Sequence, residues 1–254
     1  MAYFDFTGKT VLVTGASRGI GYGVARGFAD AGATVHILSS GQSINDAAEQ
    51  LGENVTGHIC DISDCARVAE VIEGLSGIDV LINNAGLERP TPMYQSGQQV
   101  EETFRRIIDI NIMGTFFVTR QSLRKMKNGG RIIITSSIWG KTAVPEFSAY
   151  CASKHANIGF MRSLAQELAV KEITVNAVCP GWVRTDGAMR SLKQMAQRDG
   201  RSEDKLLDEI TSAQALPGLM EPDDLASTYL FLASAAASNI TGQTLNVDRG
   251  ELMS

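Results

Sequence analysis

The chain has 254 residues, of which 44% are hydrophobic and 20% charged, and its formal net charge is −5 at pH 7. Such a composition is ordinary for a folded water-soluble protein, and this length buries a full core without disulfides or metals. The acidic balance, with no basic stripe, argues against nucleic acid as a partner. No apolar run approaches the ~18 residues that a membrane-spanning helix needs, so no membrane partner is expected.

The N-terminus and the cysteines predict a cytoplasmic protein. Residues 1–9 lack the basic segment and apolar stretch of a signal peptide. The cysteines form no C-x-x-C pair and have no histidines at metal-binding spacing, which favours reduced, mostly buried thiols and no metal. These cysteines are Cys60, Cys65, Cys151 and Cys179.

Strand-like and helix-like segments alternate along the chain. The first elements are a strand at 10–14, a helix at 20–31, a strand at 34–38, a helix at 43–51 capped by Ser43, and a strand at 55–60. A helix that is capped by Ser63 or Asp64 and ends at 75 comes next, followed by a strand at 78–82. The remaining elements are a helical region at 98–126 broken near 110–114, a strand at 131–135, a helix at 148–170, a strand at 173–178, a helix at 222–233 and a strand at 244–247. This alternation predicts an α/β fold, a doubly wound parallel sheet of about seven strands, in one domain spanning 1–254.

A polar segment rich in Met and Arg, residues 186–220, follows the sixth predicted strand. Ligands bind at the carboxyl ends of strands in doubly wound sheets. The segment is therefore a candidate lid over a binding site, with a plain helical excursion as the alternative.

A glycine-rich turn with the spacing G-x-x-x-G-x-G joins the first strand to the first helix. Glycines permit a tight turn and close backbone approach, and the helix N-terminus offers free N–H groups to a pyrophosphate. The sequence there is Gly15-Ala16-Ser17-Arg18-Gly19-Ile20-Gly21. Between a strand and a helix, it predicts nucleotide binding.

Polar residues also follow the third and fourth predicted strands. Asp61 could accept a hydrogen bond from an adenine amino group or could cap the next helix. The run Asn83-Asn84-Ala85-Gly86 could form the floor beneath a cofactor or a simple turn.

Four residues between positions 111 and 154 predict proton-transfer chemistry. Tyr150 and Lys154 are four apart and share one helix face, where an ammonium would favour the phenolate and lower the tyrosine pKa. Ser137 ends a strand, and its hydroxyl could orient a substrate carbonyl. Asn111 is a poor helix former within a helical region and could hold a water at a kink.

In order and spacing, these motifs resemble the short-chain dehydrogenase/reductase family over nearly the whole chain. The resemblance implies a Rossmann-type fold, a nicotinamide cofactor, an NAD(P)-dependent alcohol dehydrogenase or ketone reductase, and a homotetramer. It implies Tyr150 as general acid/base, Ser137 as donor to the reacting oxygen, Lys154 on the nicotinamide ribose and Asn111 as anchor of a relay water. The cofactor contacts it implies are Gly15, Ser17, Arg18, Gly19, Ile20, Gly21, Ser39, Ser40, Asp61, Ile62, Asn83, Ala85, Gly86, Tyr150, Lys154, Pro180, Gly181, Val183 and Thr185.

The end of the second strand favours NADP over NAD. Ser39 and Ser40 stand there in place of an acid that would bind the ribose 2′-hydroxyl, and Arg18 could pair with a 2′-phosphate. Alternatively, Arg18 stacks on adenine or faces solvent, as NAD enzymes tolerate.

Residues 178–185 and the following lid also resemble 3-hydroxybutyrate dehydrogenases, which use NAD. The residues that grip the substrate carboxylate in that subgroup are replaced here by Glu88, Trp139, Phe147 and Ser191. Glu88, Trp139, Phe147 and Trp182, with Ser137, would instead bind a small polyol, cyclic or amphipathic alcohol or ketone. Otherwise Trp182 packs under the lid and Glu88 pairs with Arg89 or Arg184.

Two other functions compete with the dehydrogenase. A non-catalytic nucleotide sensor would not require the set of Tyr150, Lys154, Ser137 and Asn111, and a sugar-nucleotide epimerase normally has a longer C-terminal part. At the end of the chain, Asp248-Arg249-Gly250 replaces the usual Asp-Gly-Gly, so Arg249 adds an intersubunit ion pair or faces solvent.

Overall fold

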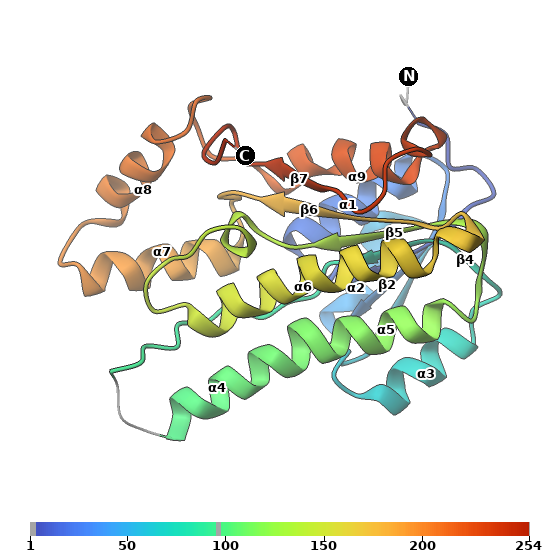
Figure 1. Ribbon diagram of the computed structural model, residues 1–254, viewed down its shortest axis with the longest axis horizontal. Coiled ribbons are helices and arrows are strands. Elements are labelled where there is room, and N and C mark those ends of the chain that lie inside the picture. Colours follow the sequence, from blue (N-terminus) through green and yellow to red (C-terminus); the bar gives the residue numbers. More distant parts are fainter. Residues whose placement is uncertain (1–3, 95–97, 254) are drawn as a thin grey trace.

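A computed structural model of the protein describes residues 4–94 and 98–253. Its centre is a seven-stranded sheet in the order β3-β2-β1-β4-β5-β6-β7, and every pairing is parallel (Figure 1). The strands are β1 (Thr10–Thr14), β2 (Thr34–Ser39), β3 (Val55–Ile59), β4 (Ile78–Asn83), β5 (Met126–Thr135), β6 (Thr174–Pro180) and β7 (Thr244–Val247). The predicted doubly wound α/β fold class is confirmed.

Helices cover both faces of the sheet (Figure 1). They are α1 (Gly19–Asp30), α2 (Ser43–Leu51), α3 (Cys65–Glu73), α4 (Gln98–Ile108), α5 (Thr115–Ser122), α6 (Ser148–Glu167), α7 (Asp186–Arg198), α8 (Glu203–Ser212) and α9 (Ala226–Ala233). Phe28 of α1 and Tyr229 of α9 are buried against one face. Val118 of α5 and Met161 of α6 are buried against the other, so the core has two apolar layers with the sheet between them.

The largest difference from the predicted elements lies between residues 98 and 135. The helical region does not extend to residue 126 but ends at Ser122, and β5 begins at Met126, which pairs with Ile78 before a register shift. Instead of a break, a π-helical turn at Asp109–Gly114 joins α4 to α5. A π turn accommodates one extra residue per turn without ending the helix, a feature that apolar periodicity does not reveal.

Helix ends differ in smaller ways. Ser43 is the first residue of α2 and does not cap it, whereas Asp64 caps α3 by accepting hydrogen bonds from two backbone N–H groups at 3.0 Å. The region 148–170 is α6 followed by a 3-10 turn, Ala169–Lys171. The region 222–233 begins as a 3-10 turn, Pro222–Leu225, before α9.

Other expectations concern cysteines and membranes. Cys60, Cys151 and Cys179 are buried, whereas Cys65 is exposed, and these thiols are free. Within residues 4–94 and 98–253, no helix combines the length and apolar character needed to cross a membrane. Part of the N-terminal stretch used above, residues 1–3, lies outside the described residues.

Two histidines touch across neighbouring strands and predict acid sensitivity. His36 Nδ1 lies 3.1 Å from His58 Nε2. Burial lowers the pKa of both, assisted at His36 by the charge of His58 and at His58 by that of Arg67. The unfolded chain therefore takes up protons near pH ~6.5, before the folded chain does, so the free energy of unfolding falls as the pH drops below that value.

We expect His36→Gln to weaken this pH dependence, measured as urea unfolding at about pH 7 and about pH 5.5. His155→Gln is the matched control, because His155 is on α6 and contacts the Cys151 carbonyl instead. Equal pH slopes in His36→Gln and the wild type would contradict the assignment.

Candidate active site

A cleft opens where the strands β1, β2, β4, β5 and β6 end. Seventeen of the nineteen predicted cofactor contacts line it, all except Gly21 and Asn83. Asn83 points elsewhere, with its amide donating to Thr119 Oγ1 at 2.9 Å. Gly21 packs against the turn itself. A Cβ at this position would clash with the Gly15 carbonyl oxygen, so only glycine allows α1 to approach the turn this closely.

The glycine turn is held against the loop after β4. Gly15 has a φ of +66°, and a Cβ there would lie 2.6 Å from Ala85 Cα. The Asn84 side chain donates to the carbonyls of Thr14 and Gly15 at 3.1 and 3.2 Å. Arg18 is the N-cap of α1, and its side chain makes no capping bond. The first turn of α1 therefore has no side-chain cap, and Gly19 and Ile20 of this turn line the cleft, an arrangement suited to a phosphate.

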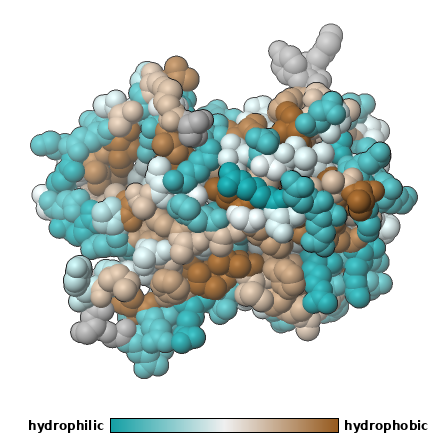
Figure 2. Space-filling model, viewed as in Figure 1, coloured by the Kyte–Doolittle hydropathy of each residue, from teal (hydrophilic) through white to brown (hydrophobic). Residues whose placement is uncertain are grey.

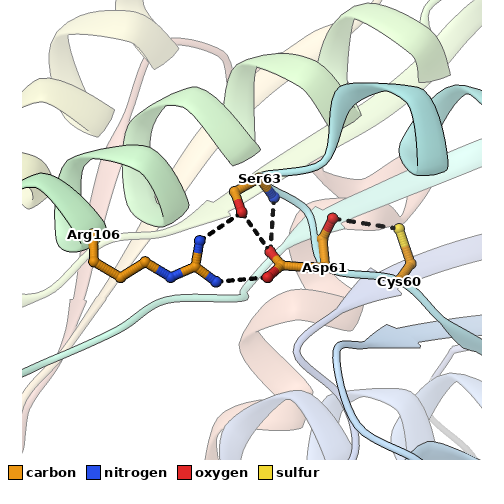
Figure 3. Close-up of polar contacts among 4 residues, drawn as sticks. All are labelled: Cys60, Asp61, Ser63 and Arg106. Carbon is orange, nitrogen blue, oxygen red and sulfur yellow. Dashed lines mark hydrogen bonds and ion pairs between the residues drawn. The ribbon is translucent and has the colours of Figure 1, made fainter.

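Asp61 also lines the cleft, but its carboxylate is tied to two other residues (Figure 3). It accepts hydrogen bonds from Ser63 N and Oγ at 3.0 and 2.7 Å, and from Arg106 Nη2 at 2.6 Å. Burial acts to raise the Asp61 pKa, but these hydrogen bonds outweigh it and the pKa lies below its usual range. The alternative role as helix cap is wrong, because Asp64 caps α3. Arg106, on α4, also lines the cleft, and no motif in the sequence pointed to it.

Tyr150, Lys154 and Ser137 meet at the centre of the cleft. Lys154 is 3% exposed, its Nζ donates to the Thr135 carbonyl at 2.8 Å, and that nitrogen lies 5.5 Å from the centre of the Tyr150 ring. Ser137 lies at the end of β5, accepts a hydrogen bond from Trp139 N at 3.1 Å and is hydrogen-bonded to the Tyr150 hydroxyl. The side chains thus place a phenol, a hydroxyl and an ammonium around one space.

The ionisation of this group differs from the expectation. Burial lowers the pKa of Lys154 to about 8. Burial and the charge of Glu88 raise the pKa of Tyr150, and the hydrogen bond with Ser137 offsets this in part. The predicted lowering of the tyrosine pKa by the lysine is therefore wrong for the chain by itself, because loss of hydration on burial is the largest influence on the Tyr150 pKa.

Asn111 lies in the π-helical turn and is fully buried. Its Oδ1 accepts from Leu87 N at 2.7 Å, and its Nδ2 donates to the Leu87 carbonyl at 3.0 Å and to Ser153 Oγ at 2.9 Å. The amide therefore joins the loop after β4 to α6. A Cβ on Gly86 would lie 3.4 Å from Lys154 Nζ and 3.5 Å from Asn111 Oδ1, so the loop passes between these two residues.

Aromatic rings form the wall beside Tyr150. Trp139 makes edge-on contacts with Trp182 and Tyr150, at centroid distances of 5.9 and 6.0 Å, and all three line the cleft. Phe147 does not line it. This residue is 1% exposed and packs behind Trp139 at 5.4 Å, so the predicted substrate contact is wrong for this side chain.

Glu88 pairs with neither candidate arginine through its carboxylate. Its Oε1 accepts a hydrogen bond from Ser191 Oγ on α7 at 2.5 Å. Arg89 donates to the Glu88 backbone carbonyl, and Arg184 pairs with Glu221 at 2.8 Å. Glu88, Arg89 and Arg190 all line the cleft.

The segment 186–220 contains two helices, α7 and α8 (Figure 1). Residues of α7 line the cleft. Near the start of the segment, Arg18 Nη1 lies 3.5 Å from Asp186, with both side chains largely exposed. At its end, Arg249 donates to the carbonyls of Leu216 and Pro217. Arg249 therefore holds the end of this segment to the C-terminal loop. The sequence had suggested either an intersubunit ion pair or a side chain facing solvent, and not this contact.

Comparison with known proteins gives extensive matches. A family model described as enoyl-(acyl carrier protein) reductase matches residues 15–251. The chain is 38% identical to 3-oxoacyl-[acyl-carrier-protein] reductase of Rickettsia prowazekii, over 98% of this chain and 99% of that protein. It is 34% identical to D-beta-hydroxybutyrate dehydrogenase of Cupriavidus necator, over 96% and 97%. A solved structure described as a putative NAD(P)-dependent gluconate 5-dehydrogenase of Beutenbergia cavernae with bound NADP has a TM-score of 0.88 and 32% identity, covering 99% of each chain.

The glycine turn yields a prediction about stability. Gly15→Ala introduces a side chain at positive φ and against the Ala85 backbone, whereas Gly129→Ala introduces one at a φ of +81° with nothing within 4 Å. We expect Gly129→Ala to lower the free energy of unfolding by about 1–2 kcal/mol and Gly15→Ala to lower it further, measured by urea denaturation. Equal losses would show that the contact with Ala85 does not constrain the turn.

Proposed function

Because this chain belongs to the short-chain dehydrogenase/reductase family of oxidoreductases, we propose that it interconverts a secondary alcohol and a ketone with a nicotinamide cofactor. The observation that carries this proposal is the convergence of Tyr150, Ser137 and Lys154 in the cleft onto which the glycine turn opens. A non-catalytic nucleotide sensor would need the glycine turn, but it would not need Tyr150, Ser137 and Lys154 to lie together in the cleft.

The proposed proton transfers use groups already in place. A nicotinamide cofactor, when bound in the cleft, would supply or accept the hydride. In reduction, the Ser137 hydroxyl binds the substrate oxygen and the Tyr150 phenol protonates it. The raised pKa of Tyr150 suits this direction, because it keeps the phenol protonated at neutral pH. In oxidation, the phenolate takes the alcohol proton, and the neighbouring Lys154 ammonium favours that charged form.

Lys154 and Asn111 complete the proposed tetrad. Lys154 would bind the nicotinamide ribose with the donor capacity left after its bond to Thr135. Asn111 would anchor the relay water. Since its side-chain amide is committed to Leu87 and Ser153, its contribution would include fixing the backbone around that water.

We propose NADP as the preferred cofactor. Arg18, Ser39 and Ser40 line one end of the cleft, and Ser17 Oγ lies 3.2 Å from Ser39 Oγ. These hydroxyls and the largely exposed guanidinium are donors suited to a 2′-phosphate, and no acid ends β2 to repel it. The solved Beutenbergia cavernae structure contains NADP, which agrees with this choice.

The relatives act on different compounds by name, from an acyl-carrier-protein derivative to hydroxybutyrate. The cleft of this chain supports a small cyclic, polyol or amphipathic substrate, since Trp139 and Trp182 offer apolar faces and Glu88 offers an acceptor. We also propose a cytoplasmic homotetramer. Its support on this chain is the apolar surface on the α5–α6 side in Figure 2. Met113 in the π-helical turn and Phe116 on α5 are also 38% and 36% exposed.

Tyr150→Phe tests the proton-transfer role. The substitution retains the ring but removes the hydroxyl, so we expect kcat for ketone reduction to fall by about 10²-fold or more while the Kd for the cofactor changes little. Tyr22→Phe is the control, because Tyr22 lies on α1 and contacts Gln50 outside the cleft. Retained turnover in Tyr150→Phe would overturn the mechanism.

Arg18→Ala tests the cofactor preference. Loss of a charge-assisted contact to the 2′-phosphate is expected to raise the Kd for NADPH about tenfold or more and to leave the Kd for NADH nearly unchanged. Arg120→Ala serves as control, since Arg120 lies over Phe116 on α5. Titration of intrinsic or cofactor fluorescence gives both constants. An unchanged NADPH affinity would remove Arg18 from the phosphate site.

A further inference from the structure

We infer that Glu88, oriented by Ser191, selects neutral polyhydroxy ketones and the corresponding polyols by binding a hydroxyl other than the one that reacts. The inference rests on the proposed function and specifies the substrate class for the same cleft. In this scheme Glu88 contacts the substrate, whereas Ser191 is a positioning residue.

A hydrogen bond from Ser191 on α7 holds the Glu88 carboxylate in one orientation. Glu88 lies just after β4 and lines the cleft, whereas Ser191 is on α7 and only 3% exposed. The 2.5 Å hydrogen bond from Ser191 Oγ to Glu88 Oε1 therefore connects two segments that are 103 residues apart. A buried hydroxyl that donates to a carboxylate fixes its rotamer, which makes the carboxylate a directional acceptor rather than a mobile charge.

The other carboxylate oxygen retains acceptor capacity. An ionised carboxylate can accept about four hydrogen bonds. Among the residues the structure describes, Glu88 Oε2 makes no hydrogen bond, and it lies about 4.0 Å from the position that a Cβ on Gly187 would occupy, at the edge of the cleft. A substrate hydroxyl can therefore donate to this oxygen without displacing Ser191.

The charges around Glu88 discriminate among substrate classes. Burial raises the pKa of Glu88, and the hydrogen bond from Ser191 and the charges of Arg89 and Arg190, which line the same cleft, offset this in part. An ammonium group that donates to Glu88 would also face two guanidinium groups, and a carboxylate substrate has no proton to donate to Glu88 Oε2. A neutral hydroxyl avoids both repulsions and still gains a hydrogen bond to a charged acceptor.

Glu88 is also near the reacting position. Glu88 and Tyr150 line the same cleft, and burial together with the charge of Glu88 raises the pKa of Tyr150. Trp139 contacts Tyr150 and Trp182 and provides a flat apolar wall beside Tyr150. A compact carbon skeleton with hydroxyl groups on one side matches this combination of an aromatic wall, the Tyr150 hydroxyl and the Glu88 carboxylate.

The test compares cyclohexanone with its 2-, 3- and 4-hydroxy derivatives, using kcat/KM of the wild type with NADPH and NADH. We expect the best hydroxylated ketone to exceed cyclohexanone by about 10- to 100-fold, the range for one hydrogen bond to a charged group. Glu88→Leu should bring this ratio close to one. Glu88→Gln keeps an acceptor oxygen and should retain part of the preference.

Two further variants separate recognition from lid attachment. Ser191→Ala should reduce the preference mainly through KM of the hydroxylated ketone. Glu146→Gln should leave it unchanged, although Glu146 contacts Arg198 of α7 at 3.1 Å and lies outside the cleft.

An unchanged ratio in Glu88→Leu would overturn the inference while the reductase assignment stands. So would a stronger wild-type preference for 4-oxocyclohexanecarboxylate or 4-aminocyclohexanone. If no ketone is reduced with either cofactor, the proposed function itself fails and the inference fails with it.

Discussion

The structure depends on how Lys154 is buried. An ammonium that is 3% exposed needs protein acceptors to replace water, and the Thr135 carbonyl at the end of β5 supplies one at 2.8 Å. Ser136 Oγ donates back to the Lys154 carbonyl at 3.0 Å. A Cβ on Gly140 would lie 2.9 Å from that same carbonyl oxygen, so close packing requires glycine there. These contacts lock the middle of α6 onto the end of β5.

The position of α6 then determines the rest of the cleft. The lock holds Tyr150, one turn before Lys154, beside Ser137, and Ser153 on the same helix receives the hydrogen bond from Asn111. Asn111 in turn fixes the backbone of Leu87, next to Glu88. Because the sheet is parallel, the ends of β1, β4 and β5 meet at one edge, and the glycine turn lies beside this group. The contacts of α6 thus bring the proton-transfer residues close to the glycine turn and to the loop that contains Glu88.

The alternating apolar runs and glycine turn predicted the sheet, its direction and most of the cleft, because parallel topology brings strand ends together whatever the side chains between them. Contacts between distant segments were not predictable in this way. Arg106 reaches Asp61 across 45 residues, and Arg249 binds carbonyls more than 30 residues away. The side-chain directions of Asn83 and Phe147 were missed because a position in the sequence does not specify which side of a strand end or loop faces the cleft. The pKa of Tyr150 was misjudged because its burial is a property of the folded chain.

We propose that the cleft supports direct hydride transfer between the nicotinamide ring and the carbon bearing the oxygen that Tyr150 protonates. This transfer can be followed with NADPH or NADH deuterated at C4 of the nicotinamide, each stereoisomer separately, and a hydroxylated cyclohexanone. We expect one stereoisomer of the reduced cofactor to place a single deuterium on the carbinol carbon of the alcohol, detected by mass spectrometry and NMR. An alcohol that forms without deuterium at that carbon from either stereoisomer would contradict it.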